Sequence, residues 1–293
     1  MGELMKIPIV FAFTDNYSVP AYVAISSLLN CANVDTQYEV IVLHIDVTLK
    51  HRRCFKKMFQ DTRHKIRFLK IDDSELKNYP KSKSWPAIVY VRLFMDELLK
   101  KYKKVIYSDV DVLFKGDLAE VYQTDITDYE WAGIRAERNG SRMIGHRYFA
   151  NNKNKYIYMS GFMLCNLEKM REESFSDIVR DNIEKYGDRL LMFDLDILNM
   201  SSSKIFAIPI RFAYLVDYYE CNDIRETGQY KYMRSIYTYK ELVSEKQKAV
   251  IIHYAGARER PWKRLCPPKE YYYYIKKMPL KLKMEYVIDK VKK

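Results

Sequence analysis

Residues 104–118 read KVIYSDVDVLFKGDL, a stretch that places two carboxylates between two short apolar runs. The first run, Val105 to Tyr107, is followed by Asp109 and Asp111, which are two residues apart. Carboxylates in an otherwise buried segment cost free energy unless a positive charge neutralises them, and hard divalent cations prefer carboxylate oxygens. The pattern therefore favours a strand whose end holds Mn²⁺ or Mg²⁺ and a nucleotide diphosphate. The alternative is that the two aspartates cap a helix or face water.

Strand-like and helix-like segments alternate over the first 110 residues. Buried runs that predict strands lie at 7–13, 38–45, 66–69 and 105–107. Helical patterns lie between them at 18–29, where Ser18 is the expected N-cap, and at 48–59 and 88–99. This alternation is typical of an α/β fold with a parallel sheet, in which ligands bind beyond the carboxyl ends of the strands. The segment Thr14 to Tyr17 and the two aspartates both follow such ends.

Glycine-rich phosphate loops are absent from this part of the chain. Gly2 is the only glycine before Gly116, which excludes both a dinucleotide-binding glycine turn after the first strand and a phosphate loop. Because no glycine-rich backbone is available here to bind phosphate, a metal ion held by Asp109 and Asp111 would have to do so. This strengthens the interpretation of the carboxylate pair as a metal site.

The second half of the chain has fewer regular patterns. Strands are expected at 131–134, 158–167 and 250–256, a helix at 168–186, a polar loop at 137–157, and irregular Tyr-rich structure at 201–248. Gly161 within a buried strand indicates a close backbone approach. Asp194 and Asp196 open a further helix, where simple capping is the alternative to a functional role.

His253 ends the last predicted strand and is followed by a cluster of basic residues. A histidine at a strand end is often structural. Next to Gly256 and basic residues such as Arg260, it can also serve as a third metal ligand beside cations that bind phosphate.

The composition indicates the cellular compartment of the protein and excludes some protein classes. The 293 residues are 48% hydrophobic, and the five cysteines include no Cys-x-x-Cys pair, which fits a reducing cytoplasm rather than a disulfide framework or a zinc knuckle. The N-terminus lacks the pattern of a signal peptide, and no apolar run is long enough to span a membrane. We therefore expect a cytoplasmic protein.

The C-terminal segment is strongly basic. Residues 260–293 hold 11 Lys and Arg against three acids, a net +8 of the chain's total of +12. Lysines interleaved with tyrosines suit the inner face of an anionic membrane, and a solvated basic helix is the alternative. We assign residues 1–265 to a catalytic domain and 266–293 to a basic aromatic tail that can associate peripherally with a membrane.

Six motifs together resemble family 8 glycosyltransferases, the group with bacterial lipopolysaccharide galactosyl- and glucosyltransferases and glycogenin. They occur in the family's order over residues 7–265: Ile9-Val10-Phe11-Ala12 with Asp15-Asn16-Tyr17, Val91-Arg92-Leu93, Val105 to Asp111, Ser160-Gly161-Phe162, Asp194 to Asn199, and His253-Tyr254-Ala255-Gly256 with Arg260-Pro261-Trp262. The resemblance implies a GT-A fold, which is Rossmann-like, with a mixed, mostly parallel sheet and a basic C-terminal helical extension. It also implies Mn²⁺-dependent transfer of galactose or glucose from a UDP-sugar to a glycan or lipid-linked acceptor, with retention of anomeric configuration.

The resemblance also implies a role for each matching residue. Asp109, Asp111 and His253 would hold the metal, with Val110 between the two aspartates in the donor site. Thr14, Asn16 and Tyr17 would line the uridine pocket, and Tyr17 would stack on uracil. Arg92 and Asp194 would position the donor sugar, while Gly256 and Arg260 would contact the diphosphate.

Three positions depart from the family's pattern. Met159 replaces an asparagine that binds the sugar, and Leu195 replaces a glutamine considered as a nucleophile, which leucine cannot be. The segment between Gly256 and Pro261 is one residue longer, with Arg260 in place of a lysine. Retention would then need a front-face mechanism or Asp194 as nucleophile, and we favour the former.

Other functions remain open on sequence grounds. These departures could produce a catalytically silent homologue that binds UDP without turnover, and glycogenin-like self-glucosylation would require an acceptor among the 26 tyrosines. A nucleic-acid-binding protein is the third alternative, because the tail is basic and aromatic. No nucleic-acid motif supports it, so we expect no nucleic-acid partner.

Overall fold

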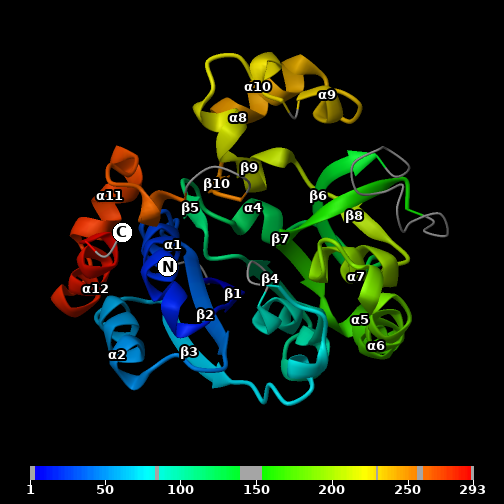
Figure 1. The fold of residues 1–293 in the computed structure, drawn as a ribbon, viewed down its shortest axis with the longest axis horizontal. Helices are drawn as coiled ribbons and strands as arrows, with labels where there is room; N and C mark the ends of the chain where they lie inside the picture. Colours follow the sequence, from blue (N-terminus) through cyan, green and yellow to red (C-terminus); the bar gives the residue numbers. More distant parts are fainter. Residues whose placement is uncertain (1–3, 83–85, 139–153, 229, 256–259, 292–293) are drawn as a thin grey trace.

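The computed structural model describes residues 4–82, 86–138, 154–228, 230–255 and 260–291 (Figure 1). Its main sheet has the strand order β3-β2-β1-β4-β7-β6-β8. The bounds are β1 (Met5–Ala12), β2 (Thr36–His44), β3 (Lys65–Lys70), β4 (Lys104–Ser108), β6 (Trp131–Arg138), β7 (Tyr156–Asn166) and β8 (Ile205–Ala207). Strands β3, β2, β1 and β4 are parallel, whereas β7 is antiparallel to both β4 and β6. The predicted α/β class with a mixed, mostly parallel sheet is confirmed.

A second, three-stranded sheet lies beside the first. It contains β5 (Val112–Phe114), β10 (Ile251–His253) and β9 (Tyr214–Leu215) in the order β5-β10-β9. The antiparallel register of β5 and β10 pairs His253 with Val112, the residue after Asp111. This pairing brings the end of the chain's last strand to the carboxylates at the end of β4.

Helices in the first half lie close to their predicted positions. Their bounds are α1 (Ser18–Asn30), α2 (Leu49–Met58), a 3₁₀ helix over Ala87–Phe94, α3 (Met95–Leu98) and α4 (Ala119–Tyr122). The prediction that Ser18 caps α1 was wrong, because Tyr17 holds the N-cap position without a side-chain cap and Ser18 is the first residue of the helix. The helix expected at 88–99 is mostly 3₁₀ and becomes α-helical only at Met95.

The second half contains more regular structure than its sequence suggested. The helix expected at 168–186 is broken into α5 (Leu167–Glu172) and α6 (Phe175–Tyr186), since Ser174 has φ 52°. The expectation of irregular structure at 201–248 was wrong. That region holds β8, β9, α8 (Val216–Glu220), α9 (Tyr230–Met233) and α10 (Tyr239–Gln247), and the three helices form a lobe at the top of Figure 1.

The described part of the chain before α11 (Lys269–Lys276) also contains helix α7 (Asp194–Ser201) and several short 3₁₀ helices. The short helices are Asp15–Tyr17, Leu76–Asn78, Gly187–Arg189, Ile210–Ala213, Ile224–Glu226 and Pro261–Lys263. Strands β6 and β7 enter the loop expected at 137–157, whose residues 139–153 lie outside the described residues.

The C-terminal segment forms α11 (Lys269–Lys276) and α12 (Leu280–Val291), which lie beside α1 (Figure 1). Tyr271, Leu282 and Tyr286 are buried in the same hydrophobic cluster as β1 and α1. This inner face of the two helices is therefore part of the main core. Among the described residues, no helix has the length and apolar character needed to cross a membrane.

Two buried histidines, His64 and His44, lead us to expect that the stability of this core depends on pH. His64 is 7% exposed, and its Nδ1 accepts a hydrogen bond from the Tyr38 backbone N–H at 3.0 Å, which requires an unprotonated nitrogen. Burial lowers the pKa of His64 to about 4, with a smaller effect from Arg63, and burial lowers the pKa of His44 to about 4 as well. The unfolded chain, in which histidine has a pKa of about 6.5, therefore binds more protons than the folded chain does between pH values of about 4 and 6.5.

We expect the free energy of unfolding to fall as the pH drops from 7 to 5, by about 1–2 kcal/mol for each of these histidines. Urea unfolding at the two pH values measures this. The variant His64→Asn keeps an acceptor for the Tyr38 amide but cannot titrate, so its pH dependence should be smaller. An equal pH dependence in the variant would show that His64 is not a source of the effect.

Candidate active site

A cleft of about 540 Å³ opens at the carboxyl ends of β1 and β4. Its lining comes from the ends of the strands in both sheets, from the 3₁₀ helix at Ala87–Phe94, from the start of α7 and from the α8–α9 lobe. The position agrees with the prediction that ligands bind beyond the carboxyl ends of the parallel strands.

Three predicted metal ligands meet at the floor of this cleft. His253 Nε2 lies 3.2 Å from Asp111 Oδ1 and 3.9 Å from Asp109 Oδ2, and one ligand atom from each residue lies within 4.8 Å of the others. Carboxylate oxygens and an imidazole nitrogen are a suitable donor set for Mn²⁺, and their spacing allows all three to reach one ion. The residues present therefore fit a divalent cation.

The electrostatics of this cluster also indicate a site for positive charge. Burial acts to lower the pKa of His253, but Asp111 and Asp109 outweigh burial and raise it above its ordinary value. Burial acts to raise the pKa of Asp111, but His253 and Arg260 outweigh it and lower that pKa. Two carboxylates thus face one buried imidazole, an arrangement that favours a proton or a cation between them.

Gly161 makes room for this cluster. A Cβ atom at Gly161 would lie 2.4 Å from His253 Cε1 and 2.9 Å from Asp109 Oδ2, and the Gly161 carbonyl accepts a hydrogen bond from the Asp109 N–H at 2.8 Å. Because β7 pairs with β4 and β6 on its two sides, its backbone cannot easily move away. The close backbone approach predicted at Gly161 is confirmed.

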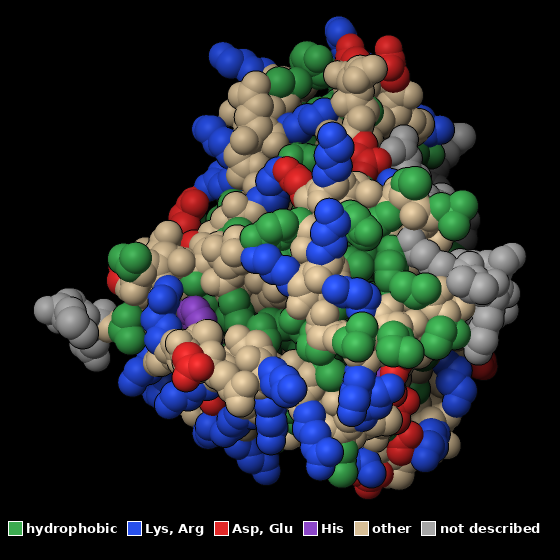
Figure 2. Space-filling model, turned by 90° about the vertical axis from the view of Figure 1, so that its left-hand side faces the viewer, with side chains coloured by type: hydrophobic (Ala, Val, Ile, Leu, Met, Phe, Trp, Pro, Cys, Tyr) green, Lys and Arg blue, Asp and Glu red, His purple; other side chains and the backbone are tan. Residues whose placement is uncertain are grey.

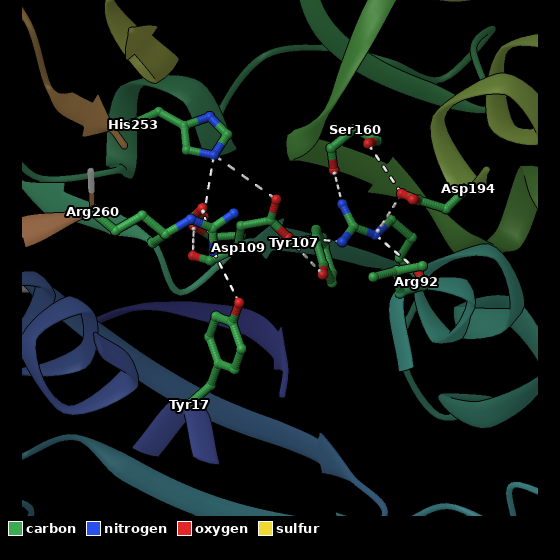
Figure 3. A network of polar contacts seen from close by, with 11 residues as sticks. Tyr17, Arg92, Tyr107, Asp109, Ser160, Asp194, His253 and Arg260 are labelled. Carbon is green, nitrogen blue, oxygen red and sulfur yellow. Dashed lines mark hydrogen bonds and ion pairs between the residues drawn. The ribbon is translucent and has the colours of Figure 1, made fainter. Parts of the chain in front are cut away.

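Arg92 connects the cluster to Asp194 (Figure 3). Its guanidinium donates to Asp109 Oδ1 and to the Ser160 carbonyl, both at 2.8 Å, and its Nε lies 3.2 Å from Asp194 Oδ2. Burial acts to lower the pKa of Arg92, but the two carboxylates outweigh burial, so its pKa is raised. Burial raises the pKa of Asp194 to about 6, although Arg92 acts in the opposite direction.

Asp109 uses its two oxygens differently. Oδ1 accepts hydrogen bonds from Arg92 and from the Tyr107 hydroxyl at 3.0 Å, while Oδ2 faces His253. The contacts with Arg92 and Tyr107 therefore orient the Asp109 carboxylate so that Oδ2 points toward the candidate metal site. Contacts of this kind, made by residues that do not bind the metal, influence the affinity of metal sites.

Tyr17 and Arg260 lie on the opposite side of the cluster from Asp194 (Figure 3). Arg260 Nη1 donates to the Tyr17 hydroxyl at 3.0 Å and lies 3.7 Å from Asp111 Oδ2. The Tyr17 ring has an edge contact with Trp262, at 6.1 Å between ring centroids. The floor of the cleft thus carries an aromatic ring and a cation on one side and the Arg92–Asp194 pair on the other.

The remaining predicted residues divide into three groups. Thr14, Val110 and Leu195 line the cleft. Asn16 is exposed and is not part of the lining, and its side-chain oxygen accepts a hydrogen bond from the Thr14 hydroxyl. Gly256 lies outside the described residues.

Several cleft residues were not predicted. Ser160 lines the cleft, and Tyr107 is fully buried and donates to Asp109 without lining the cleft; both belong to motifs quoted above, but no role was assigned to them. Tyr232 and Met233 reach the cleft from the lobe, where irregular structure was expected. A signal for that lobe was present, because Thr238 and Glu241 form a capping box that starts α10.

Comparison with known proteins supports the fold and assigns the family. Residues 8–266 match the sequence profile of glycosyl transferase family 8. Lipopolysaccharide 1,2-glucosyltransferase from Escherichia coli is 25% identical over 273 residues, which cover 89% of this chain and 75% of that protein.

Two solved structures share the fold at lower identity. Galactosyltransferase LgtC, solved with donor and acceptor sugar analogs, is 22% identical with a TM-score of 0.79, and the match covers 95% of this chain and all of LgtC. The bifunctional glycosyltransferase WbbM, in its apo structure, is 20% identical with a TM-score of 0.79. That match covers 99% of this chain, which spans only 53% of WbbM. The predicted GT-A fold is confirmed, and since the family match covers most of its 293 residues, this chain belongs to glycosyl transferase family 8.

Proposed function

We propose that this protein transfers a hexose from a UDP-hexose to a saccharide acceptor, with retention of anomeric configuration and with Mn²⁺ as cofactor. The main support is that Asp109, Asp111 and His253 converge in a cleft with a ring and a cation on one side and a buried Arg–Asp pair on the other. Donor type, metal and stereochemistry are parts of this proposal that go beyond membership of the family.

The three ligands would hold Mn²⁺, which supplies positive charge to the diphosphate leaving group. Arg260, 3.7 Å from Asp111, is placed to contact the same diphosphate and stabilise its developing charge. Tyr17 offers its ring to uracil. The sugar would then extend toward Arg92 and Asp194, where a carboxylate can stabilise an oxocarbenium-like centre.

Leu195 excludes a mechanism in which the side chain at this position acts as the nucleophile. It lines the cleft next to Asp194, and its alkyl side chain can neither attack the sugar nor accept a proton. We therefore favour a front-face mechanism. The bond between the anomeric carbon and the phosphate oxygen breaks, the acceptor oxygen bonds to that carbon on the same face, and the acceptor proton passes to the departing phosphate.

Release of UDP from a panel of UDP-sugars, without acceptor, tests the proposal. We expect one sugar to give UDP in the presence of Mn²⁺ and none to do so in EDTA. Mn²⁺-dependent UDP binding without turnover, either alone or with candidate saccharide acceptors, would instead favour a catalytically silent homologue, for which Met159 and Leu195 in the cleft are the structural argument. Absence of UDP binding would contradict the donor and metal assignments.

We also propose that α12 attaches the protein to the cytoplasmic face of an anionic membrane. Leu282 and Tyr286 of this helix face the core, yet Leu280 and Met284 are 72% and 54% exposed, and Val287 and Ile288 are exposed as well. Figure 2 shows hydrophobic side chains among many Lys and Arg on the side where α11 and α12 lie. An apolar stripe flanked by lysines is complementary to anionic lipid.

Substitution of the outer stripe should release the protein from vesicles without affecting the cleft. We expect Leu280→Ser/Met284→Ser/Ile288→Ser to lose most sedimentation with vesicles that contain phosphatidylglycerol, while UDP binding stays at the wild-type level. The substitutions spare Leu282 and Tyr286, so the core contacts of α12 remain. Equal sedimentation of the variant and the wild type would exclude this stripe as the membrane contact.

A further inference from the structure

His51 in α2 joins the C-terminal helix to the segment that enters the cleft. Its Nε2 lies 2.7 Å from Glu285 Oε2 of α12, and its Nδ1 lies 2.8 Å from Asp15 Oδ1. The His51 side chain is 6% exposed, so the ring itself is shielded from bulk solvent, whereas its two carboxylate partners are partly exposed. Lys50 forms a second ion pair with Glu285. These contacts form a continuous link from α12 to the end of β1.

Asp15 belongs to the short helix that places Tyr17 in the cleft. Asp15 Oδ1 also accepts a hydrogen bond from the Thr48 N–H at 2.8 Å, and the Asp15 N–H donates to Asp46 Oδ1 at 2.9 Å. Thr14, which precedes Asp15, and Tyr17, which follows it by two residues, both line the cleft. The contacts of Asp15 thus help to hold Thr14 and Tyr17, two of the three residues assigned to uridine, in place.

We propose that Glu285 and His51 are positioning residues for nucleotide binding, so that the packing of α12 controls the affinity of the cleft for the nucleotide. The proposal rests on the proposed function for the identity of the nucleotide. Without Glu285, one nitrogen of a buried ring would lose its partner, and the ring would be free to turn away from Asp15. The segment from Thr14 to Tyr17 would then have to be ordered by the nucleotide itself, which weakens binding.

The test compares Glu285→Ala with Glu270→Ala. Glu270 lies on α11 and pairs with Lys115 at 2.9 Å, so its removal also deletes an ion pair of the C-terminal segment but leaves the His51 link intact. We expect Glu285→Ala to raise the Kd for UDP, measured by calorimetry with Mn²⁺, about five- to tenfold, and Glu270→Ala to leave it unchanged. Glu285→Gln keeps an oxygen that can accept from His51 and should restore most of the affinity.

Hydrogen exchange of the metal-free and nucleotide-free protein gives a second readout. The backbone amides of Asp15, Tyr17 and Thr48 should exchange faster in Glu285→Ala than in the wild type or in Glu270→Ala. His51→Gln provides a further variant if the alanine variant folds poorly, and it should show the same change in exchange.

The outcomes separate this inference from the proposed function. A wild-type protein that does not bind UDP would contradict the proposed function, while the exchange measurement would still test the link from Glu285 to Asp15. If the wild type binds UDP but Glu285→Ala matches Glu270→Ala in both affinity and exchange, then Glu285 only anchors α12 and the inference is wrong.

Discussion

Asp111→Asn should abolish metal-dependent UDP binding while the chain stays folded. The Asp111 carboxylate would supply one of the three proposed ligand atoms and lies 3.2 Å from His253 Nε2, and an amide there would remove a negative charge that favours a divalent cation. We expect the affinity for UDP with Mn²⁺ to fall about 100-fold or more, since loss of a direct ligand should exceed the effect of losing a supporting contact.

Calorimetry with Mn²⁺ and with EDTA measures this effect. The wild type should bind UDP tightly only with Mn²⁺, and the variant should bind equally weakly in both. Asp125→Asn is a suitable control, because Asp125 hydrogen-bonds only to the nearby Thr127 in the contacts described for it and does not line the cleft. If Asp111→Asn binds UDP as the wild type does, the metal assignment fails.

Gly161→Ala should disable the site through one added methyl group. The new Cβ would lie 2.4 Å from His253 Cε1, so the imidazole or the Asp109 carboxylate must move. A displacement on the order of 1 Å in a site of this kind can reduce turnover by about 100-fold. We expect a loss of that size in Mn²⁺-dependent UDP release, with a thermal stability that falls only modestly.

Gly228→Ala is the matched control for this variant, because among the described residues, chain neighbours aside, no heavy atom lies within 4 Å of the position that its Cβ would occupy. The direct measurement is titration of Mn²⁺ into each protein in the presence of UDP. Wild-type Mn²⁺ affinity in Gly161→Ala would mean that the His253 ring or the Asp109 carboxylate can shift without weakening metal binding, and it would contradict this prediction.

The parallel half of the fold could be predicted because each of its strands is marked by a sequence pattern within a short stretch of the chain. The runs that form β1, β2, β3 and β4 are short, apolar and separated by helical patterns, and each can be recognised without knowledge of its neighbours. The same holds for Asp109 and Asp111, which follow β4 directly, and for Gly161, whose presence in a buried strand indicated a close contact. The lobe was missed because its helices are short and rich in tyrosine, although the capping box of α10 was visible.

The sequence by itself determined the α/β class, the carboxylate pair and the family resemblance, because these depend on periodicity and on residues close together in the chain. The tertiary structure decided how distant residues combine. His253, 142 residues from Asp111, reaches it because β5 and β10 pair, and Glu285 reaches Asp15 through His51 because α12 packs beside α1 and α2. Such contacts depend on strand register and helix packing, which arise only when the chain is folded as a whole.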